Sequence, residues 1–337
     1  MHSFVTLTCP AHTGSPVLLN EASDCYRCPE GCVFPIVNGI PRFVSTDNYA
    51  ASFGLQWNSF RRTQLDSFTG TTISRDRLQR IAGGSLDVFR GQDVLEAGCG
   101  AGRFTEIMLA AGARVFAADI SSAVDANREN CAAATGYFVC QADIVHLPLP
   151  SEQFDIVACI GVIQHTPDPE ATMVALCSHL KPGGRLFIDH YPPNYPMTLS
   201  RRLLRRFLLT RSSVYSLRFC TNLVGWLWPL HRLMWRIFRA SPLGRLPLLP
   251  KVRSLFLRLS PLVDYHDAYP QLGAELLRTW ALLDTHDTLT DVYKHLRSRE
   301  QIETHLSRCG METIETALAG NGIEARARKP AGTSGDN

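Results

Sequence analysis

Short apolar runs alternate with amphipathic stretches through the middle of the chain. The apolar runs predict strands at 93–97, 114–118, 137–141, 154–160 and 185–190, and the stretches between them predict helices at 102–111, 122–134 and 169–180. This alternation with short connections predicts a parallel sheet covered by helices on both faces, a doubly wound α/β core over residues 92–190. Ligands of such sheets bind beyond the carboxyl ends of the strands, so we expect functional side chains there. Those ends carry Glu96, Asp119, Asp143, Ile160 and His190.

The segments on either side of this core have patterns of their own. Within 46–91, Phe53 and Trp57 fall on one face of a predicted helix. That helix either packs on the core or borders the ligand site through Trp57, Arg61 and Gln64. Residues 271–330 predict a helix at 272–283, a polar and aromatic loop at 283–295, a helix at 298–308 and two edge strands at 311–316 and 321–329. Residues 331–337 are expected to be disordered.

Residues 191–270 interrupt the alternation with a basic helical insertion. Between Leu199 and Val263 there are twelve arginines, one lysine and no acidic residue. The apolar stretches are too short to span a bilayer, which takes about 20 residues. Three interpretations stay open: a lid whose arginines attract an anionic substrate, a surface that lies on an anionic membrane through 199–262, or a packed insertion whose arginine stems cover apolar surface.

Composition narrows the class of protein. The chain has 337 residues, 45% of them hydrophobic, which is enough for one large core or two modest ones. Its net charge of +3 does not by itself indicate a nucleic-acid partner. Its first residues lack a basic segment followed by an apolar one, so we expect no secretory signal. The eleven cysteines show no spacing typical of the disulfide framework of a secreted protein, so we expect them to be reduced thiols. The expected location is the cytoplasm, with peripheral membrane association as the alternative.

Three glycines at alternate positions follow Glu96 at the end of the first predicted strand: Gly98, Gly100 and Gly102. Glycines let a ligand lie against bare backbone, and the helix that follows offers free N–H groups. A dinucleotide fingerprint would require glycine where Arg103 stands, which disfavours a nicotinamide enzyme. The spacing instead resembles motif I of the class I methyltransferases, which use S-adenosylmethionine. The later strand ends and the stretch 180–188 resemble further motifs of that family, in the same order.

This resemblance covers residues 92–190 and implies a Rossmann-like, seven-stranded, mostly parallel sheet that ends in an antiparallel pair. It also implies S-adenosylmethionine as the cofactor. The implied cofactor-binding residues are Glu96, Gly98, Cys99, Gly100, Gly102, Arg103, Asp119, Ile120, Asp143, Ile144, Ile160 and His165. In the family pattern Asp119 would accept the ribose hydroxyls, Asp143 would accept the adenine amine, and Ile120 and Ile144 would enclose the adenine.

Methyl transfer needs a nucleophile in line with the sulfonium methyl, at about 3 Å, and little else. A general base is needed only where the acceptor is a weakly acidic hydroxyl or carbon. Histidine suits this role because it titrates near neutral pH. The candidate catalytic residues are His165, His190, His286, Asp287 and His295.

Residues 1–45 are predicted to form a small separate module. Two close pairs have spacing that suits a tetrahedral zinc site with nitrogen and sulfur ligands. The candidate ligands are Cys9, His12, Cys28 and Cys32, with Cys25 as a rival. A module this short cannot bury enough apolar area to fold alone, which favours a metal. It resembles the zinc ribbon in front of some methyltransferases, including certain rRNA guanine methyltransferases, although His12 replaces a cysteine. The alternative is a metal-free packed hairpin.

The leading functional hypothesis is methyl transfer from S-adenosylmethionine to a small-molecule acceptor, anionic or lipid-like, enclosed by the insertion. An RNA methyltransferase is the alternative, because of the ribbon and the basic insertion. A hypothesis of another class is a cofactor-binding scaffold without catalysis.

Overall fold

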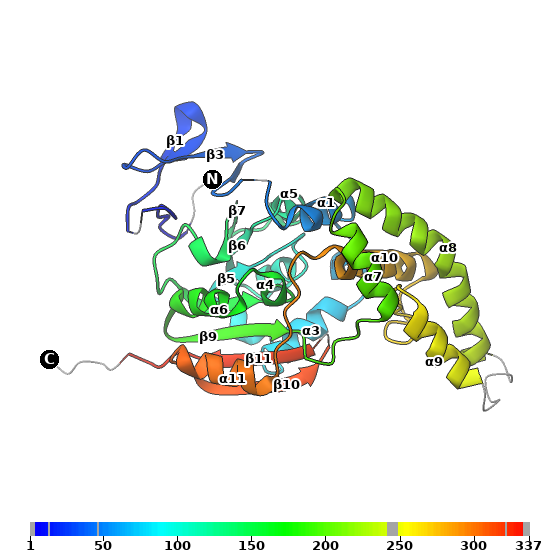
Figure 1. Ribbon diagram of the computed structural model, residues 1–337. Coiled ribbons are helices and arrows are strands. Elements are labelled where there is room, and N and C mark those ends of the chain that lie inside the picture. Colours follow the sequence, from blue (N-terminus) through cyan, green and yellow to red (C-terminus); the bar gives the residue numbers. More distant parts are fainter. Residues whose placement is uncertain (1–3, 13, 46, 241–248, 321, 333–337) are drawn as a thin grey trace. The chain divides into compact units, whose positions relative to one another are not determined.

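The parallel strands predicted from the apolar runs form the centre of a seven-stranded sheet with the order β10-β11-β9-β8-β5-β6-β7 (Figure 1). The strands are β5 (Asp93–Ala97), β6 (Arg114–Asp119), β7 (Tyr137–Gln141), β8 (Phe154–Cys159), β9 (Leu180–His190), β10 (Glu312–Ala319) and β11 (Gly322–Arg328). Strands β5 to β9 pair in parallel, whereas β11 is antiparallel to both β9 and β10. The predicted antiparallel pair at the edge is therefore confirmed, and β11 inserts between β9 and β10.

The computed structural model describes residues 4–12, 14–45, 47–240, 249–320 and 322–332. The described chain forms two units: the first comprises 1–66, 72–195 and 293–337, and the second comprises 67–71 and 196–292. Of the tail predicted to be disordered, 333–337 lie outside the described residues, as does Asn321 at the predicted start of the last strand.

Helices lie between the strands of the first unit as expected. They are α1 (Ala51–Ser59), α3 (Ile73–Ile81), α4 (Thr105–Ala110), α5 (Ala123–Cys131), α6 (Pro169–Ser178) and α11 (Arg299–Arg308), and the short α2 (Asp66–Thr69) spans the first boundary between the units. Apolar side chains of the strands form two buried clusters, which include Phe116 and Phe138 in one and Val115 and Phe187 in the other. Strand β9 begins at Leu180, earlier than the predicted 185, because Leu180 pairs with Phe154 before a register shift.

The N-terminal module of the first unit is a four-stranded antiparallel sheet. Its strands are β1 (Leu18–Asn20), β2 (Cys25–Arg27), β3 (Val33–Val37) and β4 (Ile40–Pro41). Directly after β4, Arg42 forms a parallel bridge to Gln141 at the end of β7, and the Phe43 N–H donates to the Gln141 carbonyl at 2.8 Å. The module therefore continues the edge of the main sheet at β7.

The second unit is helical, with α7 (Leu199–Leu208), α8 (Ser213–Ala240), α9 (Leu249–Leu259) and α10 (Ala274–Thr290). The predicted loop at 283–295 is wrong over its first half, because α10 continues through Thr290. Leu282, Thr285 and Leu289 are buried at helical spacing, and the polar residues between them obscured this period in the sequence. Among the described residues, none of the helices combines the length and the apolar character needed to cross a membrane.

Two arginines of the basic stretch have structural partners inside the second unit. The buried Arg201 guanidinium donates to the carbonyls of Pro261 and Leu262 at 3.0 and 2.7 Å, which ties α7 to the segment after α9. Arg205 donates to the Asp291 carboxylate at 2.9 Å, which ties α7 to the end of α10. The charges of these two residues are therefore used within the fold, and the three interpretations of the insertion as a whole stay predictions.

A buried polar network joins α8 to the segment after α9. His231 hydrogen-bonds through Nε2 to Ser260 Oγ at 2.7 Å and through Nδ1 to Asp264 at 2.7 Å. His266 hydrogen-bonds to the same carboxylate at 2.6 Å and stacks on Trp228. The two histidines lower the pKa of Asp264 against the opposing effect of burial. Ser260, His231 and Asp264 form a hydrogen-bonded series like that of a catalytic triad. Because His231 and Ser260 are buried, this series lies inside the unit.

Candidate functional site

The glycine-rich turn after β5 lies at the carboxyl ends of the parallel strands. Gly98, Gly100 and Gly102 all have positive φ angles, of 81°, 48° and 95°, a region that L side chains rarely adopt. The Gly98 N–H donates to the Ala118 carbonyl of β6 at 2.7 Å. A Cβ on Gly98 would lie 2.3 Å from a methyl of Val162, in the loop after β8. Glycine is therefore required at 98 by both backbone conformation and space.

Asp119 is held beside this turn. One carboxylate oxygen accepts from the Gly100 N–H at 2.9 Å, and the other accepts from the N–H and hydroxyl of Ser121 at 2.8 and 2.7 Å. Burial raises the pKa of Asp119, and these three donors act in the opposite direction. Oδ1 already accepts two hydrogen bonds and Oδ2 accepts one, so the carboxylate is oriented before a ligand binds. A ligand with two hydroxyls would use the open acceptor site on Oδ2 and replace the Ser121 hydroxyl on Oδ1.

The segment after β7 carries the next two predicted cofactor residues. Asp143 is the N-cap of a short 3₁₀ helix, η3 (Ile144–His146), and accepts from the Val145 N–H at 3.1 Å and from His146 at 3.2 Å. Ile144 is buried and Ile120 is half-buried. The Ile120 carbonyl accepts from the side-chain amides of Asn48 and Gln141, at 2.8 and 2.9 Å, which fixes the backbone next to Asp119.

Glu96 lies inside the fold, beneath the glycine turn. The Thr105 hydroxyl donates to its carboxyl at 2.5 Å, the Asn127 amide donates to Thr105 at 3.0 Å, and the Tyr137 hydroxyl donates to Asn127 at 2.7 Å. All four side chains are buried. Burial raises the pKa of Glu96 to about 8, and the hydrogen bond from Thr105 opposes this. The network reaches the turn because Asn127 also donates to the Cys99 carbonyl at 3.3 Å.

Arg103 and Cys99 both face protein groups. The Arg103 guanidinium donates to Ser74 Oγ at 2.8 Å and to Gln64 Oε1 at 2.9 Å, which attaches the glycine turn to the first turn of α3 and to the segment before it. Gln64 is thus a support of the turn. The Cys99 thiol is buried, and burial raises its pKa. Trp57 lies beside the turn as well, since a Cβ on Gly100 would be 3.7 Å from its indole nitrogen.

Two residues at this edge were missed in the sequence. Arg77 of α3 forms a buried ion pair with Asp189 of β9, and Asp189 also accepts from the Gly161 N–H at 2.5 Å. The pair therefore fixes the loop after β8, which begins with the buried Ile160. The only sequence signal was that Asp189, like Asp119, is an acid at the carboxyl end of a predicted strand. Its partner is 112 residues away in the chain.

Tyr49 was also missed, although it lies near both predicted cofactor acids. Burial is the main cause that raises the pKa of Tyr49, and the negative charges of Asp143 and Asp119 raise it further. Its ring meets the edge of Tyr293, with ring centroids 5.3 Å apart. No motif marks this position, because Tyr49 precedes α1 in a segment without family features.

His165 lies in an aromatic cluster at the ends of β8 and β9. It belongs to the 3₁₀ helix η4 (Ile163–His165), and its ring is 5.3 Å from Phe53 and 5.4 Å from Tyr191. The distance from Nδ1 to the Tyr293 carbonyl is 3.3 Å. Because a carbonyl only accepts, Nδ1 carries the proton and Nε2 carries the lone pair in the neutral ring. Tyr195 stacks on Tyr191, and the Lys294 ammonium lies 4.9 Å from the Tyr195 ring centroid.

His190 is buried at the end of β9. Its Nδ1 hydrogen-bonds to the Tyr191 carbonyl at 3.0 Å, and burial lowers its pKa to about 4. Side chains alternate along a strand, so His190 points to the opposite face from Asp189. That face carries Leu186 and Ile188, which pack in the cluster with α6 and α11.

The remaining candidate bases fall in different units. His295 lies in the first unit, where its N–H donates to the Gln164 carbonyl at 2.9 Å and its ring stacks on Tyr293. His286 and Asp287 lie in the second unit, on α10, in the part that was predicted as a loop.

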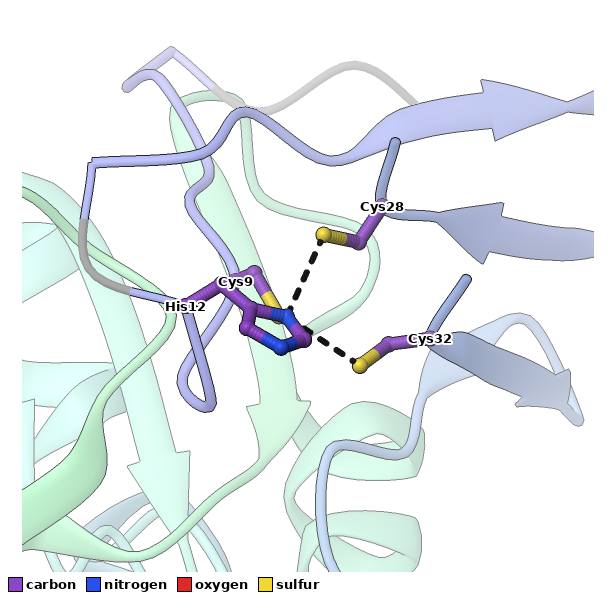
Figure 2. A group of neighbouring side chains, drawn as sticks. All are labelled: Cys9, His12, Cys28 and Cys32. Atoms are coloured by element: carbon purple, nitrogen blue, oxygen red, sulfur yellow. Dashed lines mark hydrogen bonds between the residues drawn. The ribbon is translucent and has the colours of Figure 1, made fainter. Parts of the chain in front are cut away.

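The N-terminal module brings four predicted metal ligands together. The sulfurs of Cys9, Cys28 and Cys32 lie 3.6, 3.6 and 3.5 Å from His12 Nδ1, and all four ligand atoms are within 4.8 Å of one another. Figure 2 shows the three thiols converging on one edge of the imidazole. Bonds of about 2.3 Å to sulfur and 2.0 Å to nitrogen at a tetrahedral angle give a nitrogen–sulfur separation of about 3.5 Å, so the group fits zinc. Cys25 lies outside this group, with its sulfur 3.3 Å from Ser23 Oγ.

Strand order, the glycine turn and an acid at the end of the second parallel strand together define a class I methyltransferase fold. Residues 95–188 match the methyltransferase domain family. The matched region includes the glycine turn, Asp119 and Asp143.

Curated relatives match the same region. The chain is 32% identical over 109 residues to a ubiquinone biosynthesis O-methyltransferase of Coxiella burnetii, covering 32% of this chain and 46% of that protein. It is 33% identical over 132 residues to the enzyme of the same name from Methylococcus capsulatus, covering 38% and 52%. The chain thus spans about half the length of the curated relatives it matches.

Solved structures with distant similarity include two methyltransferases. An S-adenosylmethionine-dependent methyltransferase from Mesorhizobium loti is 17% identical with a TM-score of 0.42, covering 74% of this chain and 96% of that one. Magnesium protoporphyrin IX methyltransferase from Synechocystis, with S-adenosylhomocysteine bound, is 16% identical with a TM-score of 0.37, covering 85% and 90%.

Proposed function

We propose that the protein transfers a methyl group from S-adenosylmethionine to an oxygen of a small, lipid-like or anionic acceptor. The observation that carries this proposal is the placement of Asp119. Its carboxylate is fixed against the glycine turn by the Gly100 N–H, within the region that matches the methyltransferase domain. A fixed carboxylate suits the vicinal hydroxyls of a ribose, because it can accept a hydrogen bond from each.

The other strand-end residues would complete a nucleoside site. Asp143, the N-cap of η3, would accept from the adenine amine, and Ile120 and Ile144 would offer apolar surface for the ring. The glycine turn lets the amino-acid part approach the backbone. When bound, the cofactor supplies an electrophilic methyl group on a sulfonium sulfur. The protein's task is then to hold the acceptor oxygen in line and to accept its proton.

We assign proton removal to His165 rather than His190. The Nδ1–H of His165 is directed at the Tyr293 carbonyl, which leaves Nε2 as the basic nitrogen, and the ring belongs to the aromatic cluster. His190, with a pKa of about 4, is a weaker base and points to the α6 and α11 face. We expect His165→Ala to lower kcat by about 100-fold, the usual size of a general-base effect, and His190→Ala to lower it much less. Initial rates, with cofactor affinity measured separately, distinguish the two variants.

The acceptor proposal has two supports. Phe53, Tyr191, Tyr195 and Tyr293 offer ring faces and edges near His165, and Lys294 adds a positive charge. The curated relatives are named for methylation at oxygen in the biosynthesis of ubiquinone, a lipid quinone. Both features favour an aromatic hydroxyl acceptor with an apolar tail.

The test is release of S-adenosylhomocysteine from S-adenosylmethionine by the purified chain. Catechols with and without a prenyl tail should support turnover, with a lower KM for the tailed compound. Turnover with bulk tRNA or rRNA alone would instead establish the RNA methyltransferase alternative. Cofactor binding without turnover on any of these acceptors, or on cell extract, would indicate the scaffold.

We further propose that the second unit contacts an anionic membrane surface, where such an acceptor would reside. On α8, Trp226, Leu230 and Leu233 are exposed at positions i, i+4 and i+7, and Trp226 is 86% exposed. Exposed Arg232 and Arg236 flank this stripe. Helix α9 repeats the pattern, with exposed Val252, Leu255 and Leu259 beside exposed Lys251 and Arg258. An apolar stripe with basic residues beside it is the composition of helices that lie in the membrane interface.

Vesicle sedimentation tests this contact. The chain should sediment with phosphatidylglycerol-containing vesicles at low salt and much less with pure phosphatidylcholine. Replacing Arg232 and Arg236 by Gln should weaken binding by roughly 30-fold, from about 1 kcal/mol per charge near an anionic surface. Arg75 and Arg90, exposed on the first unit, provide the matched control with the same change of charge. Equal binding by both double variants would refute this surface.

Finally, we propose that Cys9, His12, Cys28 and Cys32 hold a structural zinc ion. The donor set and the separations suit a closed tetrahedral site, and such an ion contributes folding free energy directly.

A further inference from the structure

We infer that the metal group of the N-terminal module is a positioning element for the cofactor, acting through residues 143–148. This inference rests on the zinc ion proposed above and extends it from stability to ligand affinity. The effect would pass through the chain between the metal ligands and Asp143.

The first link is a direct hydrogen bond. The N–H of Thr8, next to the ligand Cys9, donates to the Pro148 carbonyl at 2.9 Å. Pro148 ends the short segment that begins with Asp143 and η3. Thr8 also forms an antiparallel β-bridge with Pro16, and the Cys9 N–H donates to the Ser15 carbonyl at 2.8 Å. These bonds close the turn that carries His12, so the turn and the contact with Pro148 are held by the same residues.

The second link is apolar packing. Cys9 and Cys28 are buried in the same cluster as Ile144, Leu147 and Leu149. Leu7, Val17 and Tyr26 of the module belong to it too. Two of the four proposed ligands therefore belong to the same apolar cluster as the 143–148 segment.

A third link fixes the other end of the same segment. Phe43, at the exit of the module, pairs with Gln141 at the end of β7. The Arg42 guanidinium donates to Gln141 Oε1 at 3.2 Å and to Asp125 at 2.7 Å, and the Gln141 amide donates to the Ile120 carbonyl. Residues 143–148 are thus held on both sides by one small module whose own stability depends on the metal.

Cofactor affinity should therefore depend on the metal. If the nucleoside binds the ion-free protein without the Asp143 contact, the dissociation constant rises by about the value of one hydrogen bond to a charged group, roughly tenfold. Loss of the ion should affect the contact of Asp143 more than that of Asp119, because Gly100 and Ser121 hold the Asp119 carboxylate directly.

The experiment compares Cys32→Ser with Cys25→Ser in the full chain, with zinc content by mass spectrometry and S-adenosylhomocysteine affinity by calorimetry. Cys32→Ser should lose zinc and bind the nucleoside about tenfold more weakly, and Cys25→Ser should match the wild type in both. Removing zinc from the wild type with a chelator and restoring it should reproduce the loss reversibly, which excludes misfolding of the variant as the cause.

A double-mutant cycle locates the effect. Asp143→Asn should weaken nucleoside binding in the zinc-loaded protein and weaken it much less in Cys32→Ser, whereas Asp119→Asn should keep most of its cost in Cys32→Ser. Unchanged affinity after zinc loss, full zinc retention by Cys32→Ser, or equal coupling to Asp119 and Asp143 would overturn the inference. A zinc-free wild type that binds the nucleoside would refute the zinc site and leave the methyltransferase proposal intact.

Discussion

Asp119→Asn is expected to raise the dissociation constant for S-adenosylhomocysteine by about 100-fold or more. Hydrogen bonds to a charged group contribute about 1.5–3 kcal/mol each, and the proposed site uses this carboxylate for two ribose hydroxyls. Asparagine keeps one acceptor oxygen but turns an NH₂ toward either the Gly100 N–H or the Ser121 donors. The NH₂ group, which is a hydrogen-bond donor, then faces another donor. The hydrogen bond at that position is lost, and with it part of what orients the glycine turn.

Isothermal calorimetry on ligand-stripped protein measures this effect. Asp87→Asn is the matched control, because its carboxylate is exposed and lies away from the strand ends. Its affinity should equal that of the wild type. Binding by Asp119→Asn within threefold of the wild type would mean that the carboxylate does not contact the nucleoside, and the proposed function would lose its main support.

Glu96→Gln is expected to stabilise the ligand-free protein at alkaline pH and to change its stability little in acid. The Glu96 pKa is raised from 4.5 to about 8, so the folded protein holds a proton that the unfolded chain has released over this interval. The stability that protonated Glu96 contributes is fully present below pH 4.5 and is lost as the pH rises through 8. Glutamine is neutral throughout and can accept the Thr105 hydrogen bond. The difference in unfolding free energy should reach on the order of 4 kcal/mol at high pH.

Thermal and denaturant unfolding at pH 5 and pH 8.5 test this prediction. Glu152→Gln, an exposed acid, should give the same small difference at both pH values. A Glu96→Gln variant that is equally destabilised at both would show that Glu96 is ionised in the folded protein. In that case its main role would be as a charged partner of Thr105.

Features of the fold that depend on residues close together in the chain could be predicted from the sequence. The parallel strands follow from continuous apolar runs, and the glycine turn and strand-end acids follow from where those runs stop. Spacing alone also brought Cys9, His12, Cys28 and Cys32 together as one group, which the structure places within a common radius. The role of each in binding stays a prediction.

Features that depend on distant contacts were not predictable. The Arg77–Asp189 pair joins α3 to β9, and neither residue lies in a motif. Glu96 was expected among the cofactor-binding residues, but no pattern in the sequence indicated that its carboxyl is buried under the turn in a chain of hydrogen bonds from Thr105 and Asn127. The end of α10 was hidden because several of its buried residues are polar, among them Thr285, His286 and Thr288, so the sequence shows no apolar stripe there.

The insertion of β11 between β9 and β10 has a consequence for biosynthesis. Residues 191–321, including the whole helical stretch 196–292, are translated between β9 and its antiparallel neighbour. At about 5–20 residues per second, β9 waits roughly 7–26 s with one backbone edge unpaired. During that interval the nascent sheet presents a hydrogen-bonding edge that other chains could join. The ribosome-bound intermediate, rather than the finished protein, is therefore where protection by a chaperone would matter most.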